Sequence, residues 1–187
     1  MSNFMNQYAL FENLPVKAPL TQGIKYAGSK QKLLPYIPQL INKVSPKVVL
    51  DGFAGTTRVS QALAQSGYRV ISNDISVWSE VFGNCYLMNK QPASYYIPVL
   101  KHLNQLQPID GWYTEHYGGE IQINGEPAHS GLKHPWQKHN TRKLDAIGDE
   151  IAEMNLPYEE ECVLLTSLIL ALDQEDRFIR QVSALAF

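Results

Sequence analysis

The architecture of this chain follows from the segment Val48-Val49-Leu50-Asp51-Gly52-Phe53-Ala54-Gly55-Thr56-Thr57. Its first three residues form a short apolar run that includes two β-branched valines, which predicts a buried parallel strand that ends at Asp51. The small residues of the following turn let the backbone approach a ligand, and Thr56 or Thr57 is placed to cap a helix. The segment therefore predicts a strand, a glycine turn and a helix in direct succession.

The residues after this turn complete a crossover unit. The predicted helix ends at Gly67, because glycine readily adopts the left-handed conformation that terminates helices. Residues 68–72 then predict a second strand, which is followed by Asn73-Asp74. A strand, a helix and a second strand of this combined length are typical of a right-handed parallel crossover. We therefore predict an α/β fold with a Rossmann-like core, incomplete in this chain, and a mostly helical or irregular second lobe.

Two acidic residues indicate which ligand the turn would bind. Asp74 lies 19 residues after Gly55, where nucleotide-binding folds place the carboxylate that accepts the ribose hydroxyls. The dinucleotide pattern G-x-G-x-x-G is absent, as is a phosphate-loop lysine. Asp51 would repel a phosphate and attract a cation. These features favour S-adenosylmethionine, which joins adenine and ribose to a positively charged methionine and carries no phosphate.

The composition of the 187 residues limits other functions. Apolar residues make up 44% and charged residues 18%, which is typical of a globular protein. The 16 Lys and Arg residues against 18 Asp and Glu residues give a net charge of −2, which excludes a strongly basic nucleic-acid coat protein. Two cysteines build no disulfide framework, and no signal peptide or membrane-length apolar run is visible. We therefore expect a soluble, cytoplasmic protein without a membrane partner.

The rest of the chain is dominated by helical patterns. Apolar periodicity predicts helices over residues 76–90, 93–106, 141–154 and from Pro157 to about residue 173. Residues 108–138 are rich in glycine, proline and aromatic side chains, which predicts an irregular region with a small hairpin at residues 121–125. The histidines and cysteines follow no zinc-ligand spacing, so we predict no metal site. The predicted parts are an N-terminal extension (1–20), a cofactor-binding α/β part (21–92), a helical and irregular lobe (93–173) and a divergent tail (174–187).

Three motifs resemble those of the adenine-specific DNA methyltransferases of the alpha group, the family of bacterial and phage DNA adenine methylases. The family's cofactor segment, glycine motif and acidic ribose motif resemble, in this order, Lys25-Tyr26-Ala27-Gly28-Ser29-Lys30, residues 51–60 and Ser72-Asn73-Asp74. Residues 140–151 are similar to the helix that precedes that family's catalytic strand, and residues 162–173 resemble the buried helix that comes next. The resemblance covers residues 20–173.

The resemblance implies S-adenosylmethionine as the cofactor. Residues at the methionine end of the cofactor would be Lys25, Tyr26, Gly28 and Lys30. Lys30 would pair with the methionine carboxylate, although Tyr26 as a core residue and Lys30 as a solvated helix-start lysine are the alternatives. The turn beneath the cofactor would consist of Asp51, Phe53, Ala54 and Gly55, and Asp74 would hold the ribose.

Double-stranded DNA is the partner that the resemblance implies, with residues 93–173 on the DNA-recognition side. A modest basic patch in this lobe supplies the candidate DNA contacts, which are Lys133, Lys138, Arg142 and Lys143. The aromatic residues at 112–119 also suit nucleic acid. Packing of these aromatic side chains within their own lobe is an equal alternative.

The family's catalytic strand ends in Asp-Pro-Pro-Tyr, and the sequence contains no such tetrapeptide. The nearest string, Asn155-Leu156-Pro157-Tyr158, follows an amphipathic pattern, so we predict that it links two helices. We expect an adenine methyltransferase of a restriction-modification or orphan system, truncated before its catalytic strand, that binds the cofactor weakly and methylates nothing alone. A non-catalytic subunit that holds cofactor or DNA for a companion chain is one alternative. A small-molecule or RNA methyltransferase is another.

Overall fold

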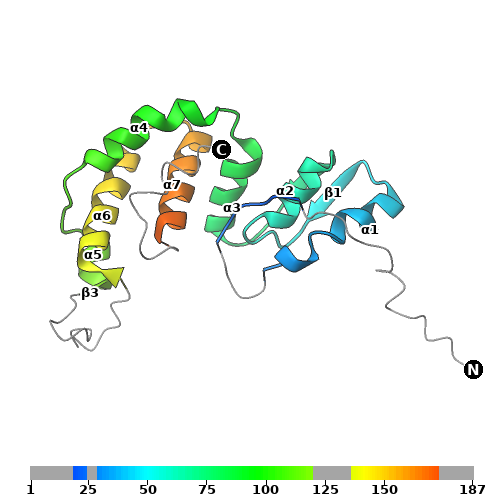
Figure 1. Cartoon of the computed structure of the whole chain (residues 1–187), viewed down its shortest axis with the longest axis horizontal. Helices are drawn as coiled ribbons and strands as arrows, with labels where there is room; N and C mark the ends of the chain where they lie inside the picture. Colours follow the sequence, from blue (N-terminus) through cyan, green and yellow to red (C-terminus); the bar gives the residue numbers. More distant parts are fainter. Residues whose placement is uncertain (1–18, 25–28, 120–135, 173–187) are drawn as a thin grey trace, which may run out of the picture. The chain divides into compact units, whose positions relative to one another are not determined.

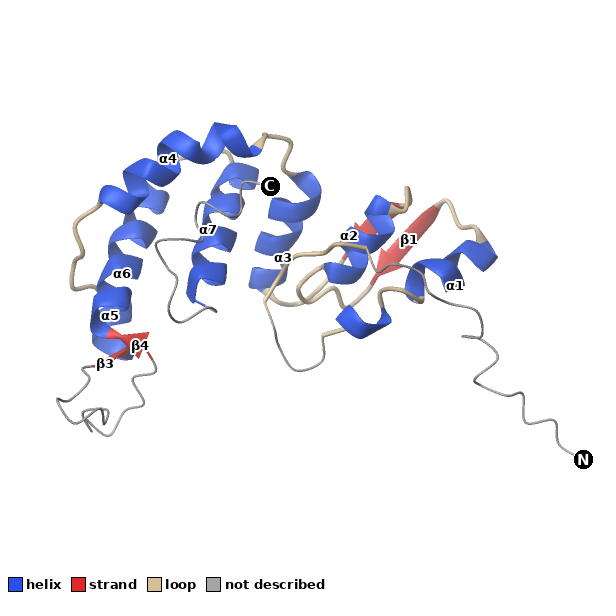
Figure 2. Ribbon diagram, in the orientation of Figure 1, coloured by secondary structure: helices blue, strands red, loops and turns tan. Residues whose placement is uncertain are grey.

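The computed structural model describes residues 19–24, 29–119 and 136–172 (Figure 1). The chain divides into two compact units, residues 1–87 and 88–187. The structure mixes helices with short strands, which pair into two small sheets of two strands each (Figure 2). Among the described helices, none combines the length and apolar character that a membrane crossing requires.

The first unit is built around one parallel strand pair and the helix that connects its strands. Its elements in chain order are η2 (Gln31–Leu33), α1 (Ile37–Val44), β1 (Val48–Asp51), α2 (Arg58–Gln65), β2 (Arg69–Ser72), α3 (Val77–Gly83) and the π-helical turn η3 (Asn84–Met88). Strand β1 pairs with β2 in parallel register from Val48 opposite Arg69 to Asp51 opposite Ser72. The predicted parallel crossover is thereby confirmed, and it brings the carboxyl ends of both strands to one edge.

Helix α2 has the predicted end but a different beginning. Gly67 follows the helix with a φ of 87°, the left-handed conformation expected of a helix-terminating glycine. Thr57 is the residue before the first turn, yet its side chain makes no capping hydrogen bond. Its hydroxyl instead accepts a hydrogen bond from Gln61 Nε2 at 3.1 Å. The prediction that a threonine side chain caps this helix is therefore wrong.

Strand β1 is less buried than the sequence predicts. Val48 and Leu50 are 43% and 65% exposed, and Ile71, which pairs with Leu50, is 51% exposed. Alternate residues of a strand point to opposite faces, so these three side chains lie on one face. Helix α2 packs on the other face, where Ser60 contacts Asp51 and Ser72. In the described part of the chain, the sheet has two strands and is covered by α2 on one face, which explains the difference.

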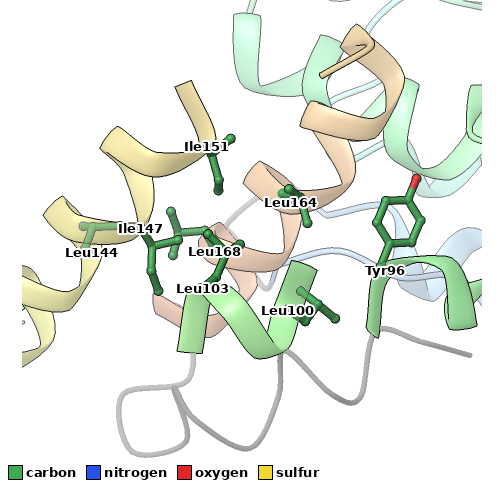
Figure 3. Packing of buried hydrophobic residues seen from close by; sticks show 8 residues of the cluster. All are labelled: Tyr96, Leu100, Leu103, Leu144, Ile147, Ile151, Leu164 and Leu168. Atoms are coloured by element: carbon green, nitrogen blue, oxygen red, sulfur yellow. The ribbon is translucent and has the colours of Figure 1, made fainter. Parts of the chain in front are cut away.

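The second unit is mostly helical. Its elements are α4 (Ala93–Gln105), α5 (Trp112–Tyr117), β3 (Gly118–Gly119), β4 (Trp136–Gln137), α6 (Lys138–Glu153) and α7 (Tyr158–Leu172). Helices α4, α6 and α7 enclose a cluster of buried side chains that point toward one another (Figure 3). The cluster consists of Tyr96, Leu100, Leu103, Leu144, Ile147, Ile151, Leu164 and Leu168. The helices predicted over 93–106, 141–154 and after Pro157 are confirmed, with α6 beginning three residues earlier.

Helix α5 corrects the prediction of an irregular stretch over residues 108–138. It spans Trp112–Tyr117. The hydrogen-bond acceptor for the backbone N–H groups at its start is Asp145, which lies more than 30 residues further along the chain. The Asp145 carboxylate accepts hydrogen bonds from the N–H groups of Gly111, Tyr113 and Thr114 at 3.1, 2.9 and 2.9 Å. Such a cap is invisible in local sequence patterns, which explains the miss. The predicted hairpin at 121–125 lies outside the described residues.

The string Asn155-Leu156-Pro157-Tyr158 connects two helices, as predicted. Helix α6 ends at Glu153 and α7 begins at Tyr158. Asn155 has a φ of 48°, a left-handed conformation that breaks the helical path. The string therefore does not follow a strand, as a catalytic tetrapeptide of the resembled family would.

Candidate functional site

Asp74 ties the glycine turn to the end of β2. Its Oδ2 accepts a hydrogen bond from the Gly55 N–H at 2.9 Å, and its Oδ1 accepts one from the Ser76 N–H at 3.0 Å. These hydrogen bonds hold the pKa of the half-buried Asp74 carboxyl below its usual range, and the bond from Gly55 has the largest effect. Each carboxylate oxygen retains a second lone pair. A ribose hydroxyl can therefore bind Asp74 while the turn stays in place.

The backbone segments that follow β1 and β2 stay hydrogen-bonded to each other beyond the ends of the strands. The Asn73 N–H donates to the Asp51 carbonyl at 2.9 Å, and the Ala54 N–H donates to the Asn73 carbonyl at 3.0 Å. The turn then passes through two left-handed positions, Gly55 at φ 52° and Thr57 at φ 59°. A β-branched residue at positive φ is strained, and such strain clusters at ligand-binding sites. This turn is therefore a candidate binding element on backbone geometry alone.

Asp51 provides a second carboxylate at the same edge. Ser60, on α2, donates its hydroxyl hydrogen to Asp51 Oδ2 at 2.6 Å, and Ser60 Oγ lies 3.0 Å from Ser72 Oγ. Asp51 and Ser72 are opposite each other in the strand register. The edge thus carries two negative charges, Asp51 and Asp74, each fixed by hydrogen bonds. This arrangement suits a ligand with hydroxyl and cationic groups and repels a phosphate.

Two large apolar side chains flank the carboxylates. Phe53 in the turn is 89% exposed, and Ile75, directly after Asp74, is fully exposed. Both side chains add exposed apolar surface next to the two carboxylates in the sequence. They offer apolar contact to a flat ring whose attached sugar reaches Asp74.

The structure brings together only part of the predicted cofactor residues. Asp51, Ala54, Gly55 and Asp74 meet at the carboxyl edge through the bonds described above. Lys30 is exposed at the start of η2 in the same unit. Three further predicted residues, Lys25, Tyr26 and Gly28, lie outside the described residues.

Sequence reasoning missed a set of polar side chains on α2. Arg58 donates to the carbonyls of Thr21 and Gly23 at 2.7 and 2.5 Å. Gln61 exchanges two hydrogen bonds with the backbone of Gln22, at 2.9 and 3.0 Å, and Gln65 donates to the Leu20 carbonyl at 2.7 Å. Burial lowers the pKa of the Arg58 guanidinium. Helix α2 thus holds residues 20–23, the segment that leads into the predicted cofactor residues 25–30.

The sequence shows the spacing of these residues but not their partners. Arg58, Gln61 and Gln65 stand at helical intervals on one face, where an amphipathic helix between two strands ordinarily carries solvated side chains. Their long polar side chains bond backbone carbonyls of residues 20–23 instead of solvent. Which segment they hold could not be known from the sequence.

The candidate DNA contacts differ in their surroundings. The Lys143 amine donates to the carbonyls of Asn104 (3.0 Å) and Leu106 at the end of α4, and burial lowers its pKa. Arg142 forms an ion pair with Asp110 at 3.0 Å. Lys138 is exposed at the first position of α6, whereas Lys133 lies outside the described residues. The Lys143 amine thus has a structural role at the end of α4.

Aromatic rings gather around α5. Trp112 stacks on His116 with ring centroids 4.5 Å apart, and Tyr117 meets Trp136 edge-on at 5.5 Å. Trp112 and Tyr113 are nevertheless 56% and 41% exposed. The aromatic residues therefore pack on one another and also present ring surface to solvent.

Comparison with known proteins places this geometry in context. The model of the D12 class N6 adenine-specific DNA methyltransferase family matches residues 26–182. The chain is similar to the type II methyltransferase M.NlaIII of Neisseria lactamica, with 29% identity over 86% of this chain and 47% of that protein. It is also similar to the modification methylase StsI of Streptococcus sanguinis, with 32% identity over 80% of this chain and 24% of that protein. No solved structure matches the chain.

The matched lengths differ between the chain and these relatives. The chain spans about half of the first relative and about a quarter of the second. The family match, in contrast, covers most of the chain, including the glycine turn and Asp74. The chain belongs to the D12 class N6 adenine-specific DNA methyltransferase family.

Proposed function

We propose that the first unit binds S-adenosylmethionine for the methylation of adenine in DNA. The observation that carries the proposal is the hydrogen bond from the Gly55 N–H to Asp74, together with the second carboxylate at Asp51. In this proposal β1, α2 and β2 are the start of a Rossmann-like core. Its glycine turn lies under the cofactor, at the carboxyl edge where such folds bind nucleosides.

The chemistry of the edge suits this cofactor group by group. Asp74 would accept the two ribose hydroxyls, and Phe53 and Ile75 would contact the adenine ring. Asp51 would face the methionine ammonium group, and Lys30 or Lys25 would pair with the methionine carboxylate. A dinucleotide or nucleoside triphosphate would bring its phosphates against two carboxylates, so neither is favoured.

The cofactor, when bound, supplies a methyl group that is already activated on a sulfonium. The chain's own residues hold and orient this group, which is how positioning contributes to rate. Within the 187 residues there is no Asp-Pro-Pro-Tyr tetrapeptide to orient the adenine amine. We propose that the chain as given binds the cofactor and leaves methyl transfer to residues outside it.

The second unit is proposed to contact double-stranded DNA in a restriction-modification or orphan methylase. Lys138 is exposed, and Arg142 is paired with Asp110 at the surface. These two residues, with Lys133, are the proposed phosphate contacts, because lysine and arginine neutralise backbone charge. The Lys143 amine is already engaged at the end of α4, so its contribution to DNA binding would be smaller.

A companion chain that carries the catalytic tetrapeptide is a second candidate, favoured by the exposed apolar face of β1 and β2. Parallel strands are ordinarily covered on both faces, and Val48, Leu50 and Ile71 are not. Co-purification of a polypeptide with Asp-Pro-Pro-Tyr would support this form of the function. Failure of any such polypeptide to bind would favour a cofactor-binding role without that partner.

Calorimetric titration tests the proposed function directly. The unchanged chain and Asp74→Ala are titrated with S-adenosylmethionine and with its demethylated product, S-adenosylhomocysteine. We expect binding by the unchanged chain and at least about tenfold weaker binding by Asp74→Ala, since two hydrogen bonds to a charged group are lost. Equal affinities would remove Asp74 from the site.

A further inference from the structure

The side chain of Ser60 lies under the proposed cofactor site without touching solvent. It is 0% exposed on the inner face of α2, and its oxygen lies 2.6 Å from Asp51 Oδ2 and 3.0 Å from Ser72 Oγ. A serine hydroxyl has a single hydrogen. The shorter contact to a carboxylate takes that hydrogen, so Ser72 donates its own hydrogen to Ser60.

The three side chains therefore form an ordered chain of donors and acceptors. Ser72 donates to Ser60, and Ser60 donates to the Asp51 carboxylate. Each link polarises the next, which strengthens the bond to the carboxylate. Because a bond to one oxygen fixes the rotation of the whole carboxylate, Ser60 also sets the direction in which the other oxygen, Oδ1, points.

The strand pairing makes this geometry specific to the site. Asp51 is the last residue of β1, and its register partner is Ser72, the last residue of β2. Ser60 reaches both from α2, so the helix, the two strands and the turn share one hydrogen-bonded group. In the proposed complex, the lone pairs of Oδ1 would accept a hydrogen bond from a donor bound over the turn, and a methionine ammonium group is such a donor.

We infer that Ser60 is a positioning residue that orients Asp51 toward the cofactor's ammonium group and so favours ligands that carry an amino acid. The inference rests on the proposed binding of S-adenosylmethionine and adds to it the residue that sets the amino-acid selectivity of the site. Ser60 acts through Asp51 and touches no ligand itself.

The test compares two ligands that differ in the amino-acid part. S-Adenosylhomocysteine carries the ammonium group, whereas 5′-methylthioadenosine keeps adenine, ribose and sulfur and lacks it. Both are titrated calorimetrically into the unchanged chain, Ser60→Ala and Ser66→Ala. Ser66 is a matched control, because its hydroxyl bonds the Ala62 carbonyl at the other end of α2.

We expect Ser60→Ala to weaken the binding of S-adenosylhomocysteine about tenfold and the binding of 5′-methylthioadenosine less than about twofold. Ser66→Ala leaves both affinities unchanged. An equal loss for the two ligands, or no loss, overturns the inference while binding by the unchanged chain still supports the proposed function. No binding of either ligand by the unchanged chain overturns the proposed function and the inference with it.

A second variant keeps the test decisive if Ser60→Ala does not fold. Ser72→Ala removes only the outer link, at an exposed strand position, and leaves Ser60 to hold Asp51. We expect this variant to bind S-adenosylhomocysteine about twofold more weakly and to bind 5′-methylthioadenosine with unchanged affinity. A loss of the same size for both ligands contradicts the inference.

Discussion

Asp74 accepts hydrogen bonds from two backbone N–H groups, and its charge state sets how strong these bonds are. The bonds from Gly55 and Ser76 lower the folded-state pKa of Asp74 below the unfolded value of about 3.9. A carboxyl group with a lowered pKa adds stability above that unfolded pKa, and the addition disappears as pH falls through the folded pKa. Protonation of Asp74 at low pH therefore removes the part of the folding stability that its charged carboxylate adds by bonding the glycine turn.

Asp74→Asn is expected to reduce stability at pH 7 by about 0.5–1 kcal/mol, because solvent screens the charge of a partly exposed carboxylate. The difference between the two proteins shrinks as pH falls below about 4, because the native carboxyl group then becomes protonated. Urea unfolding of both proteins at pH 7 and at pH 3 measures this difference in the free energy of unfolding. A difference that is constant with pH contradicts the assigned role.

Gly55 is the residue of the turn that depends on left-handed backbone. At φ 52° a side chain costs about 1 kcal/mol, so Gly55→Ala should lower the free energy of unfolding by that amount. Gly52→Ala is the control, because a Cβ there meets no atom within 4 Å. Chemical denaturation of both variants tests this, and equal stabilities of the two would contradict it.

Residue patterns predicted only part of this site. The separation of Gly55 from Asp74 was readable, because a parallel crossover places both at one edge and a glycine turn precedes a helix. The contact from Ser60 to Asp51 was not, since it depends on which face of α2 meets the strands. The hold of Arg58 on residues 20–23 was equally hidden, because its partners are backbone carbonyls without a sequence signature.

At the scale of elements, α5 depends on α6. Asp145 is 4% exposed and accepts three backbone bonds and one from the Thr114 hydroxyl at 2.6 Å. It serves as a helix cap supplied from a distant element. Gly111 is required beside it, because a Cβ at that position would lie 2.7 Å from Asp145 Cγ.

Asp145→Ala is expected to lower the free energy of unfolding by about 3 kcal/mol, because several buried N–H groups lose their acceptor. Asp149→Ala, on the exposed side of the same helix, is the control and should change stability by less than about 0.5 kcal/mol. Urea unfolding followed by circular dichroism compares them. A loss in Asp145→Ala no larger than in the control would refute the cap.

Two lysines of α6, Lys138 and Lys143, differ in their surroundings and therefore in the effects expected of their substitution. Lys143→Ala frees the carbonyls of Asn104 and Leu106 and should lower the free energy of unfolding by about 1 kcal/mol. If Lys138 contacts DNA as proposed, Lys138→Ala should lower stability less than Lys143→Ala does, weaken DNA binding at all sequences and reduce its salt dependence. Thermal unfolding and DNA titration at two salt concentrations test both. The reverse pattern would contradict the assignment.

Helices with a continuous apolar period were predictable, and helices held by distant residues were not. In α6, Leu144, Ile147 and Ile151 recur at helical spacing, and all three belong to the buried cluster (Figure 3). Residues 112–117 show no such period, because their helix is held by Asp145 instead of by its own apolar face. The burial of Val48 and Leu50 was overestimated for a similar reason, since burial depends on elements beyond the strand.

At the scale of the whole molecule, the chain holds two carboxylates at one sheet edge and contains no Asp-Pro-Pro-Tyr tetrapeptide. We expect the purified chain to transfer no labelled methyl group from S-adenosylmethionine to adenine in DNA, whereas addition of a polypeptide with Asp-Pro-Pro-Tyr from the same system restores transfer. A radiolabel assay with and without that polypeptide measures this. Robust methylation by the chain alone would contradict the division of roles.

The central claim is that an unphosphorylated, cationic nucleoside lies over the turn between β1 and α2. A crystal structure of the chain with S-adenosylhomocysteine tests it most directly. The account predicts both ribose hydroxyls within hydrogen-bonding distance of Asp74 and the ammonium group beside Asp51. A ligand bound elsewhere, with that turn empty, would contradict it.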